Sequence, residues 1–166
     1  MMSTKDFSSV QERTIAEYLG WKVVTGSGSR AGCPGDITSD SWLGECKTHV
    51  NSGKKISFNR SVWNKISCEA ASKFKYPVLF VDDGSQSISR TWCLFPYKVI
   101  SDPGYCVVDI DLEVRANIVF QHSQMLEMYN SLRRKHDPNE IILSVPFCDT
   151  YLGIVPLEVF RQMFGE

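Results

Sequence analysis

Apolar residues recur at two different spacings in the middle of the chain, and each spacing predicts a different element. From Val62 to Phe74 an apolar residue returns every four positions, which predicts a helix over about residues 60–75 with one buried face. Residues 78–81 form a short continuous apolar run, which is typical of a central strand covered on both faces. A helix followed directly by a buried strand favours a mixed α/β fold.

The first twenty residues predict another amphipathic helix, from about residue 9 to residue 19. Ser9 precedes Glu12 by three positions, which is the spacing of a capping box, and Gly20 is a natural helix stop. The apolar side of this helix is formed by Ile15, Tyr18 and Leu19. In this interpretation Glu12 caps its own helix.

A strand and a glycine-rich loop follow the first helix. Residues 21–25 have strand character, and residues 26–32 contain three glycines. A loop of this composition lets backbone N–H groups approach a phosphate, and the alternative is a connector with no ligand. No Gly-Lys-Ser or Gly-Lys-Thr follows the glycines, which disfavours nucleotide hydrolysis.

Residues 34–47 predict a β-hairpin with its tight turn at Asp40-Ser41. In that register Asp36 faces Glu45 across the two strands. Because side chains alternate along a strand, Lys47 shares the face of Glu45. The hairpin therefore gathers two carboxylates and one amine on one side.

These three side chains are suited to one kind of chemistry. Carboxylates directly opposite each other on a sheet repel, so we expect a cation between them, and a divalent cation with oxygen ligands fulfils that role. Asp36 and Glu45 would bind Mg²⁺, with Mn²⁺ as a substitute, and Lys47 would orient a water that attacks a phosphate. The sequence thus predicts phosphodiester hydrolysis. The alternative is a solvated hairpin with ordinary surface charges.

The same stretch resembles the PD-(D/E)xK nuclease superfamily. Its signature stands here as Pro34-Gly35-Asp36 followed by Glu45-Cys46-Lys47, and Gly35 is a departure that loosens the first half. The resemblance implies a restriction-endonuclease-like fold over about residues 8–95, an αβββαβ core with a mixed central sheet flanked by helices. It also implies that the backbone carbonyl of Cys46 is a further metal ligand.

Within that superfamily the layout is most similar to archaeal and phage-type Holliday junction resolvases, which carry a Glu-Arg pair in the first helix. Glu12-Arg13 resembles that pair, which implies that Glu12 completes the metal site and that Arg13 contacts DNA. The similarity extends through the glycine-rich loop, where it makes Ser27, Ser29 and Arg30 candidate backbone contacts. The implied substrate is DNA, either duplex or branched.

Basic residues are concentrated directly after the hairpin. Residues 47–75 contain seven lysines and arginines against Glu69 alone, whereas residues 76–166 contain seven basic and 12 acidic residues. A positive stretch beside a metal site is where a DNA backbone would lie, and a solvated helix face is the alternative. The candidate contacts in this stretch are Lys54, Lys55 and Arg60.

Two further polar features have both a functional and a structural interpretation. His49 continues the alternation of the hairpin, so it either assists proton transfer at the mouth of the site or is an ordinary surface histidine. The pair Asp82-Asp83 is similar to a metal site, but followed by Gly84 it is first of all a turn.

Composition places the chain among ordinary globular proteins, with 43% hydrophobic and 22% charged residues. A length of 166 residues predicts one domain, residues 1–166, with an α+β extension over about residues 96–166. Within that extension we expect strands at 105–111, 114–120, 141–145 and 151–155, and helices at 122–135 and 156–164. The extension either continues the sheet or forms a homodimer surface.

The expected compartment follows from what the sequence lacks. No apolar run approaches the roughly 20 residues of a membrane span, and the N-terminus has no signal-peptide core. Six cysteines without a CxxC or Cys/His cluster disfavour structural zinc and are typical of reduced thiols. We therefore expect a cytoplasmic protein without a membrane partner, in the host cytoplasm if a phage encodes it.

Three functions remain open from the sequence. The leading hypothesis is a metal-dependent DNA endonuclease, selective for Holliday junctions or other branched DNA if the resolvase resemblance holds. The second is an inactive module with the nuclease fold that binds nucleic acid or a protein partner. The third is a structural assembly protein that uses its strand-rich C-terminal part.

Overall fold

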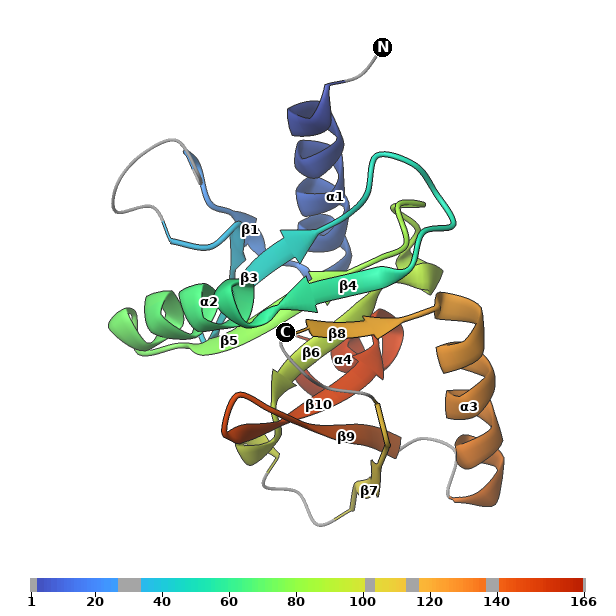
Figure 1. The fold of residues 1–166 in the computed structure, drawn as a ribbon. Helices are drawn as coiled ribbons and strands as arrows, with labels where there is room; N and C mark the ends of the chain where they lie inside the picture. Colours follow the sequence, from blue (N-terminus) through green and yellow to red (C-terminus); the bar gives the residue numbers. More distant parts are fainter. Residues whose placement is uncertain (1–2, 27–33, 101–103, 113–116, 137–140, 166) are drawn as a thin grey trace.

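The structure is a computed structural model that describes residues 3–26, 34–100, 104–112, 117–136 and 141–165 (Figure 1). Within these ranges an eight-stranded sheet runs in the order β1 (Lys22–Val23), β2 (Ile37–Thr38), β3 (Trp42–Lys47), β5 (Tyr76–Val81), β6 (Trp92–Pro96), β10 (Thr150–Pro156), β9 (Ile141–Phe147) and β7 (Cys106–Asp109). A separate ribbon pairs β4 (Ile56–Asn59) with β8 (Asn117–Phe120). The pairs β3–β5 and β7–β9 are parallel, and the remaining pairs are antiparallel. The fold is therefore mixed α/β, with a large and mostly antiparallel sheet.

Helices cover both faces of the larger sheet (Figure 1). On one face lie α1 (Thr4–Leu19) and α4 (Leu157–Phe164). The ring of Phe160 in α4 contacts Trp21, which follows α1, and Trp42 of β3, with centroid separations of 6.0 and 5.2 Å. On the other face lie α2 (Arg60–Ser72), the β4–β8 ribbon and α3 (His122–Lys135). There the buried ring of Trp92 contacts Tyr129 of α3 at a centroid separation of 6.0 Å. Two short 3₁₀ helices, η1 (Ile88–Arg90) and η2 (Tyr97–Val99), flank β6.

The first helix begins earlier than the sequence pattern predicts. Its N-cap is Ser3, whose hydroxyl accepts a hydrogen bond from the Asp6 N–H while the Asp6 carboxylate accepts one from the Ser3 backbone. The capping box predicted at Ser9 and Glu12 is therefore wrong, and Glu12 lies in the helix interior with no capping role. The stop at Gly20 is confirmed by its left-handed backbone, with φ 75°.

The second predicted helix is confirmed at its start and wrong at its end. The Asn59 side chain accepts a hydrogen bond from the Val62 N–H and caps α2, and Trp63 is buried in the core. The helix ends at Ser72, however, so Phe74 does not continue its buried face and is 98% exposed instead. Strand β4 has no counterpart in the predictions.

The C-terminal part continues the larger sheet, which is the first of the two alternatives for this segment. Strands β10, β9 and β7 follow β6 in that sheet. Helices α3 and α4 have the predicted positions, whereas the strand predicted over residues 21–25 is reduced to β1. Part of the strand predicted at 114–120 lies outside the described residues.

Among the described residues, no helix is both long enough and apolar enough to span a bilayer.

Candidate functional site

The candidate site begins where strand β2 stops and leaves the edge of β3 open. Strand β2 pairs with β3 at Thr38↔Leu43 and Ile37↔Gly44, the register expected from a turn at Asp40-Ser41. Beyond that pair, Oδ2 of Asp36 accepts a hydrogen bond of 2.8 Å from the Cys46 N–H. The carboxylate thus takes the place of a strand partner, which fixes it against the open edge of β3.

Glycine at two positions lets the hairpin close in this way. A Cβ on Gly44 would lie 2.6 Å from the ring of Phe80, so a side chain there would push β3 away from the sheet core. Gly35 has φ 68°, and a Cβ on it would lie 2.7 Å from Leu43. The residue that departs from the expected motif is therefore required by the backbone that delivers Asp36.

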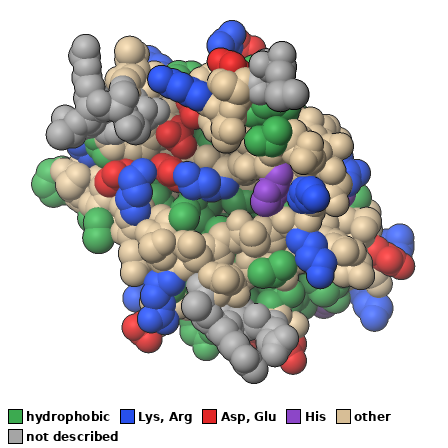
Figure 2. Space-filling view, turned by 45° about the horizontal axis from the view of Figure 1, so that its top comes forward, with side chains coloured by type: hydrophobic (Ala, Val, Ile, Leu, Met, Phe, Trp, Pro, Cys, Tyr) green, Lys and Arg blue, Asp and Glu red, His purple; other side chains and the backbone are tan. Residues whose placement is uncertain are grey.

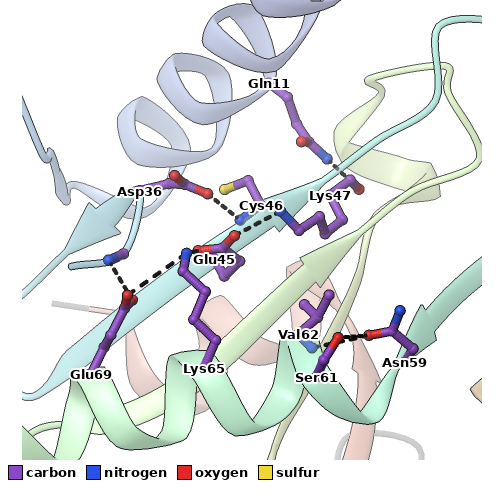
Figure 3. A network of polar contacts seen from close by, with 11 residues as sticks. Gln11, Asp36, Glu45, Cys46, Lys47, Asn59, Ser61, Val62, Lys65 and Glu69 are labelled. Carbon is purple, nitrogen blue, oxygen red and sulfur yellow. Dashed lines mark hydrogen bonds and ion pairs between the residues drawn. The ribbon is translucent and has the colours of Figure 1, made fainter. Parts of the chain in front are cut away.

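Glu45 lies on the face of β3 that α2 covers, and two ammonium groups hold its carboxylate (Figure 3). Nζ of Lys47 lies 2.7 Å from Oε1, and Nζ of Lys65 lies 3.4 Å from Oε2. The Glu45 side chain is only 5% exposed, whereas those of Lys47 and Lys65 are 44% and 55% exposed. A buried carboxylate is thus neutralised by two amines that also reach solvent.

Glu69 connects α2 to both sides of this arrangement (Figure 3). Its Oε2 accepts a hydrogen bond of 3.0 Å from the Gly35 N–H, and its Oε1 lies 3.7 Å from the ammonium of Lys65. Glu69 therefore fixes the segment that leads into Asp36 and orients Lys65 toward Glu45.

The first helix supplies the remaining carboxylate. Nε2 of the buried Gln11 donates a hydrogen bond of 3.0 Å to the backbone carbonyl of Lys47, which fixes α1 against the end of β3. The next residue, Glu12, lines a cleft of about 790 Å³ at the open edge of the strand. The charged residues that line this cleft are Lys5, Glu12, Asp36, Glu45, Lys47 and Lys65.

The carboxylates of the cleft lie close to one another, and the pKa values of Glu12 and Asp36 are raised as a result of burial and this proximity. Burial, followed by the negative charges of Asp36 and Glu45, raises the pKa of Glu12 to about 7. Burial and the charge of Glu45 also raise the pKa of Asp36, although its hydrogen bond from Cys46 acts in the opposite direction. Burial alone would lower the pKa of Lys47, but its hydrogen bond and ion pair with Glu45 outweigh that effect and raise it. Glu12 and Asp36 thus carry negative charge that the protein does not fully neutralise.

The surface around the cleft mixes both signs of charge. In the space-filling view, Lys and Arg side chains lie beside Asp and Glu side chains across the middle of one face, and a histidine lies next to them (Figure 2). This pattern differs from a uniformly positive stripe, because the basic groups border a group of acids.

The structure separates the predicted DNA contacts from the cleft. Arg13, Lys54, Lys55 and Arg60 are exposed, and none of them lines the cleft. The predicted contacts Ser27, Ser29 and Arg30 lie outside the described residues.

His49 does not line the cleft itself but lines a neighbouring pocket of about 220 Å³, together with Asp82. Lys47 lines both, so the two hollows adjoin.

Sequence reasoning missed four residues of the site. Lys65 belongs to the basic stretch over residues 47–75 but has no predicted role in the site, and neither have Lys5, Gln11 and Glu69. For Lys65 a signal was present, because it precedes Glu69 by four positions and so forms a helical ion pair with it. Which side of α2 faces Glu45 depends on how the helix packs, and the sequence pattern alone does not provide that.

A second acidic pair follows β5 and has a different environment. Asp82 is buried, and its Oδ1 accepts hydrogen bonds from the Thr48 hydroxyl at 2.5 Å and the Gly84 N–H at 2.9 Å. Asp83 is ion-paired with Arg90 through Oδ2. These contacts confirm the turn interpretation of the Asp82-Asp83 pair.

The side chains of the cleft include oxygen donors suited to a divalent cation. Among the described residues, no three carboxylate, thiol or imidazole side chains lie close enough together to form a ready-made metal cluster. The donor chemistry nevertheless suits Mg²⁺, because Glu12, Asp36 and Glu45 supply oxygen atoms and two of them have raised pKa values. The residues present therefore fit a cation that draws the three carboxylates together.

No protein-family model matches the chain, and comparison with curated proteins and with solved structures found no significant relative.

Proposed function

We propose that the protein is a Mg²⁺-dependent DNA endonuclease that hydrolyses phosphodiester bonds in duplex or branched DNA. The observation that carries the proposal is the convergence of Glu12, Asp36, Glu45 and Lys47 on one cleft. These residues come from α1, from the segment before β2 and from β3, so the fold alone brings them together. Metal-assisted hydrolysis of a phosphodiester needs such a set of oxygen ligands with an amine beside it.

Three carboxylates and one backbone carbonyl would hold the metal, with Mn²⁺ as a substitute. Because the N–H and C=O of one strand residue point to the same side, the carbonyl of Cys46 faces the open edge to which its N–H binds Asp36. Glu12 of α1 and Glu45 of β3 both line the cleft at this edge. A bound Mg²⁺ would neutralise the crowded carboxylates and polarise a phosphate oxygen.

Lys47 is suited to hold the attacking water. Its ion pair with Glu45 fixes the ammonium beside the carboxylates, and its side chain is exposed enough to reach a substrate. The raised pKa keeps this amine protonated at neutral pH, so it acts as a hydrogen-bond donor to water or to a phosphate oxygen and not as a base.

Lys65 supplies a second positive charge on the opposite side of Glu45. Its ammonium lies 3.4 Å from one carboxylate oxygen and 3.7 Å from Glu69. If Glu45 held a metal, Lys65 would be available to donate to a phosphate oxygen of the DNA strand. Lys65 is therefore a substrate-positioning residue in this proposal.

The order of elements supports the nuclease interpretation. Helix α1, strands β1, β2 and β3, helix α2 and strand β5 follow one another in the αβββαβ order that the motif implies. Strand β4 is inserted before α2 and pairs outside the larger sheet. The restriction-endonuclease-like core is the fold we propose for this part of the chain.

Cleavage assays test the proposal. Supercoiled plasmid and a synthetic four-way junction are incubated with the protein in Mg²⁺, Mn²⁺ or EDTA, and products are resolved on gels. We expect cleavage only with metal, a loss of at least about 100-fold in Asp36→Asn and Lys47→Met, and a smaller loss of about tenfold in Lys65→Met. Cutting of the junction alone would assign a preference for branched DNA.

The matched control is Asp40→Asn, which removes an exposed carboxylate from the turn of the same hairpin. It should cleave like the wild type. Cleavage by Asp36→Asn and Lys47→Met at the wild-type rate would show that the assignment is wrong.

A second candidate function is favoured by the double ion pair of Glu45. Both carboxylate oxygens are held by ammonium groups, which is the arrangement expected of an inactive module with the same fold. Such a module would bind DNA or a protein partner equally well with and without Mg²⁺. Glu45→Gln would leave that binding unchanged, whereas it would abolish metal-dependent cleavage.

A further inference from the structure

An aromatic ring projects into solvent directly after α2. Phe74 is 98% exposed, the highest value among the exposed large apolar residues of the described chain. It also has φ 57°, the left-handed conformation that bulky L-residues rarely adopt. A large apolar side chain is thus presented to water on a backbone that disfavours it.

The turn around Phe74 is a standard helix stop built with an unsuitable residue. The Phe74 N–H donates to the carbonyl of Ala71 at 3.1 Å, and the Lys75 N–H donates to that of Ala70 at 2.9 Å. Glycine is the usual residue at the left-handed position of such a stop, because it has no Cβ to clash. The phenyl ring gains no burial in return, so its presence is not explained by the stability of the fold.

The backbone that carries this ring is fixed to its surroundings. The ammonium of Lys75 donates to the Thr38 hydroxyl at 2.8 Å and to the carbonyl of Ser39. The Tyr76 N–H donates to the carbonyl of Ser41 at 2.9 Å. The residues that follow Phe74 are therefore tied to the β2–β3 hairpin that carries Asp36 and Glu45.

The position of the ring relates it to the cleft. Helix α2 carries Lys65 at the cleft and ends at Ser72, which is about 10 Å further along its axis at the usual rise per residue. That distance corresponds to about three stacked bases. The exposed Lys73 precedes Phe74, so a positive charge lies beside the ring.

We propose that Phe74 stacks on an unpaired base of the DNA substrate, a few nucleotides from the bond that is cut. This inference rests on the proposed nuclease function and specifies its substrate class as DNA with unpaired nucleotides. An aromatic ring beside a positive charge is the combination that binds single-stranded bases, since the ring stacks on the base and the amine contacts the backbone. A paired base inside a duplex does not offer its face to the ring.

The alternative occupant is a second copy of the chain. Phe74 and Lys73 form an exposed patch, and a symmetric dimer built on this patch would place it against its copy. Lys73 of each copy would then approach its counterpart. That repulsion disfavours self-association through Phe74, whereas a phosphate backbone is attracted to the same charges. The patch is therefore assigned to DNA.

Fluorescence of 2-aminopurine tests the inference. The base analogue is placed either in a single-nucleotide bulge or in a perfect duplex, and binding is measured in EDTA, which prevents metal-dependent cleavage. We expect the wild type to quench the bulged probe and to bind it about tenfold more tightly than Phe74→Gly does. Phe74→Trp should retain both effects. Tyr151→Ser, which removes another exposed aromatic ring, serves as the control and should behave like the wild type.

The melting temperature and the cleavage activity of Phe74→Gly distinguish failure of this inference from failure of the proposed nuclease function. Phe74→Gly should melt about 2–4 °C higher than the wild type, because it relieves the backbone conformation. Equal quenching by Phe74→Gly, a lower melting temperature or a change from dimer to monomer would each overturn the inference. If Phe74→Gly still cleaves duplex plasmid with Mg²⁺, the nuclease function stands independently of this result; if neither protein cleaves any DNA, the proposed function fails instead.

Discussion

The cleft beside β3 and the turn after β5 both gather carboxylates near the ends of two neighbouring parallel strands, but they neutralise them differently. In the turn, Asp83 is ion-paired with Arg90, and the Oδ1 of Asp82 accepts two hydrogen bonds. In the cleft, Glu45 is neutralised by two amines, while Glu12 and Asp36 retain raised pKa values. The fold gives Asp83 its partners, whereas Glu12 and Asp36 keep unneutralised charge. Asp82 is intermediate, because burial raises its pKa and its Oδ2 is buried without a hydrogen-bond partner among the described residues.

The pKa values of Asp83 in the turn and Glu12 in the cleft shift in opposite directions. Burial alone would raise the pKa of Asp83, but hydrogen bonds from Arg90 and Ser85 outweigh that effect and lower it to about 2. In the cleft, burial and neighbouring negative charges act in the same direction and raise the pKa of Glu12 to about 7. Asp83 therefore gains stability from its charge at neutral pH, and Glu12 loses stability from its charge.

The largest expected effect on stability comes from breaking the turn. Arg90→Met leaves the buried carboxylate of Asp83 without its ion pair, so we expect the free energy of unfolding to fall by about 2 kcal/mol at pH 7. Because the pKa of Asp83 is lowered, this contribution is present above about pH 4 and disappears as the pH falls toward 2. Urea unfolding at several pH values measures it.

The exposed Arg13 provides the control for that experiment. Arg13→Met should change the free energy of unfolding by less than about 0.5 kcal/mol. If Arg90→Met unfolds at the same urea concentration as the wild type, the turn does not depend on its ion pair.

A smaller effect of opposite sign is expected in the cleft. Because the folded state raises the pKa of Glu12, the folded protein binds that proton more tightly, and stability falls as the pH rises from about 4.5 to about 7. Glu12→Gln removes this loss, so without metal it should stabilise the protein by about 1 kcal/mol at pH 8, after allowance for solvent screening, and have no effect at pH 4.

The matched control is Glu17→Gln, an exposed position on the same helix. It should leave stability unchanged at both pH values. Destabilisation by Glu12→Gln at pH 8 would mean that this carboxylate serves the fold.

The hairpin could be predicted from the sequence because local rules determine it. The turn at Asp40-Ser41 sets the register, and alternation then places Lys47 on the face of Glu45. Helix α2 could be predicted for the same reason, since its apolar period and the cap at Asn59 are local signals.

The parts that could not be predicted depend on packing between distant segments. Lys65 contacts Glu45 because α2 packs across β3, and Phe74 is exposed because the helix stops two residues before it. Phe74 is apolar and so fits the four-residue spacing of the helix, but at the left-handed stop its ring points away from the core. The start of α1 was missed because two capping signals occur in succession and the earlier one at Ser3 forms.

Titration of Mn²⁺ into the metal-free protein, followed by calorimetry, tests the difference between the cleft and the turn most directly. We predict one bound ion in the wild type, loss of that ion in Asp36→Asn, and retention of it in Asp83→Asn and Asp40→Asn. Binding that persists in Asp36→Asn, or a wild-type protein that takes up no ion, would contradict a metal site at the open edge of β3.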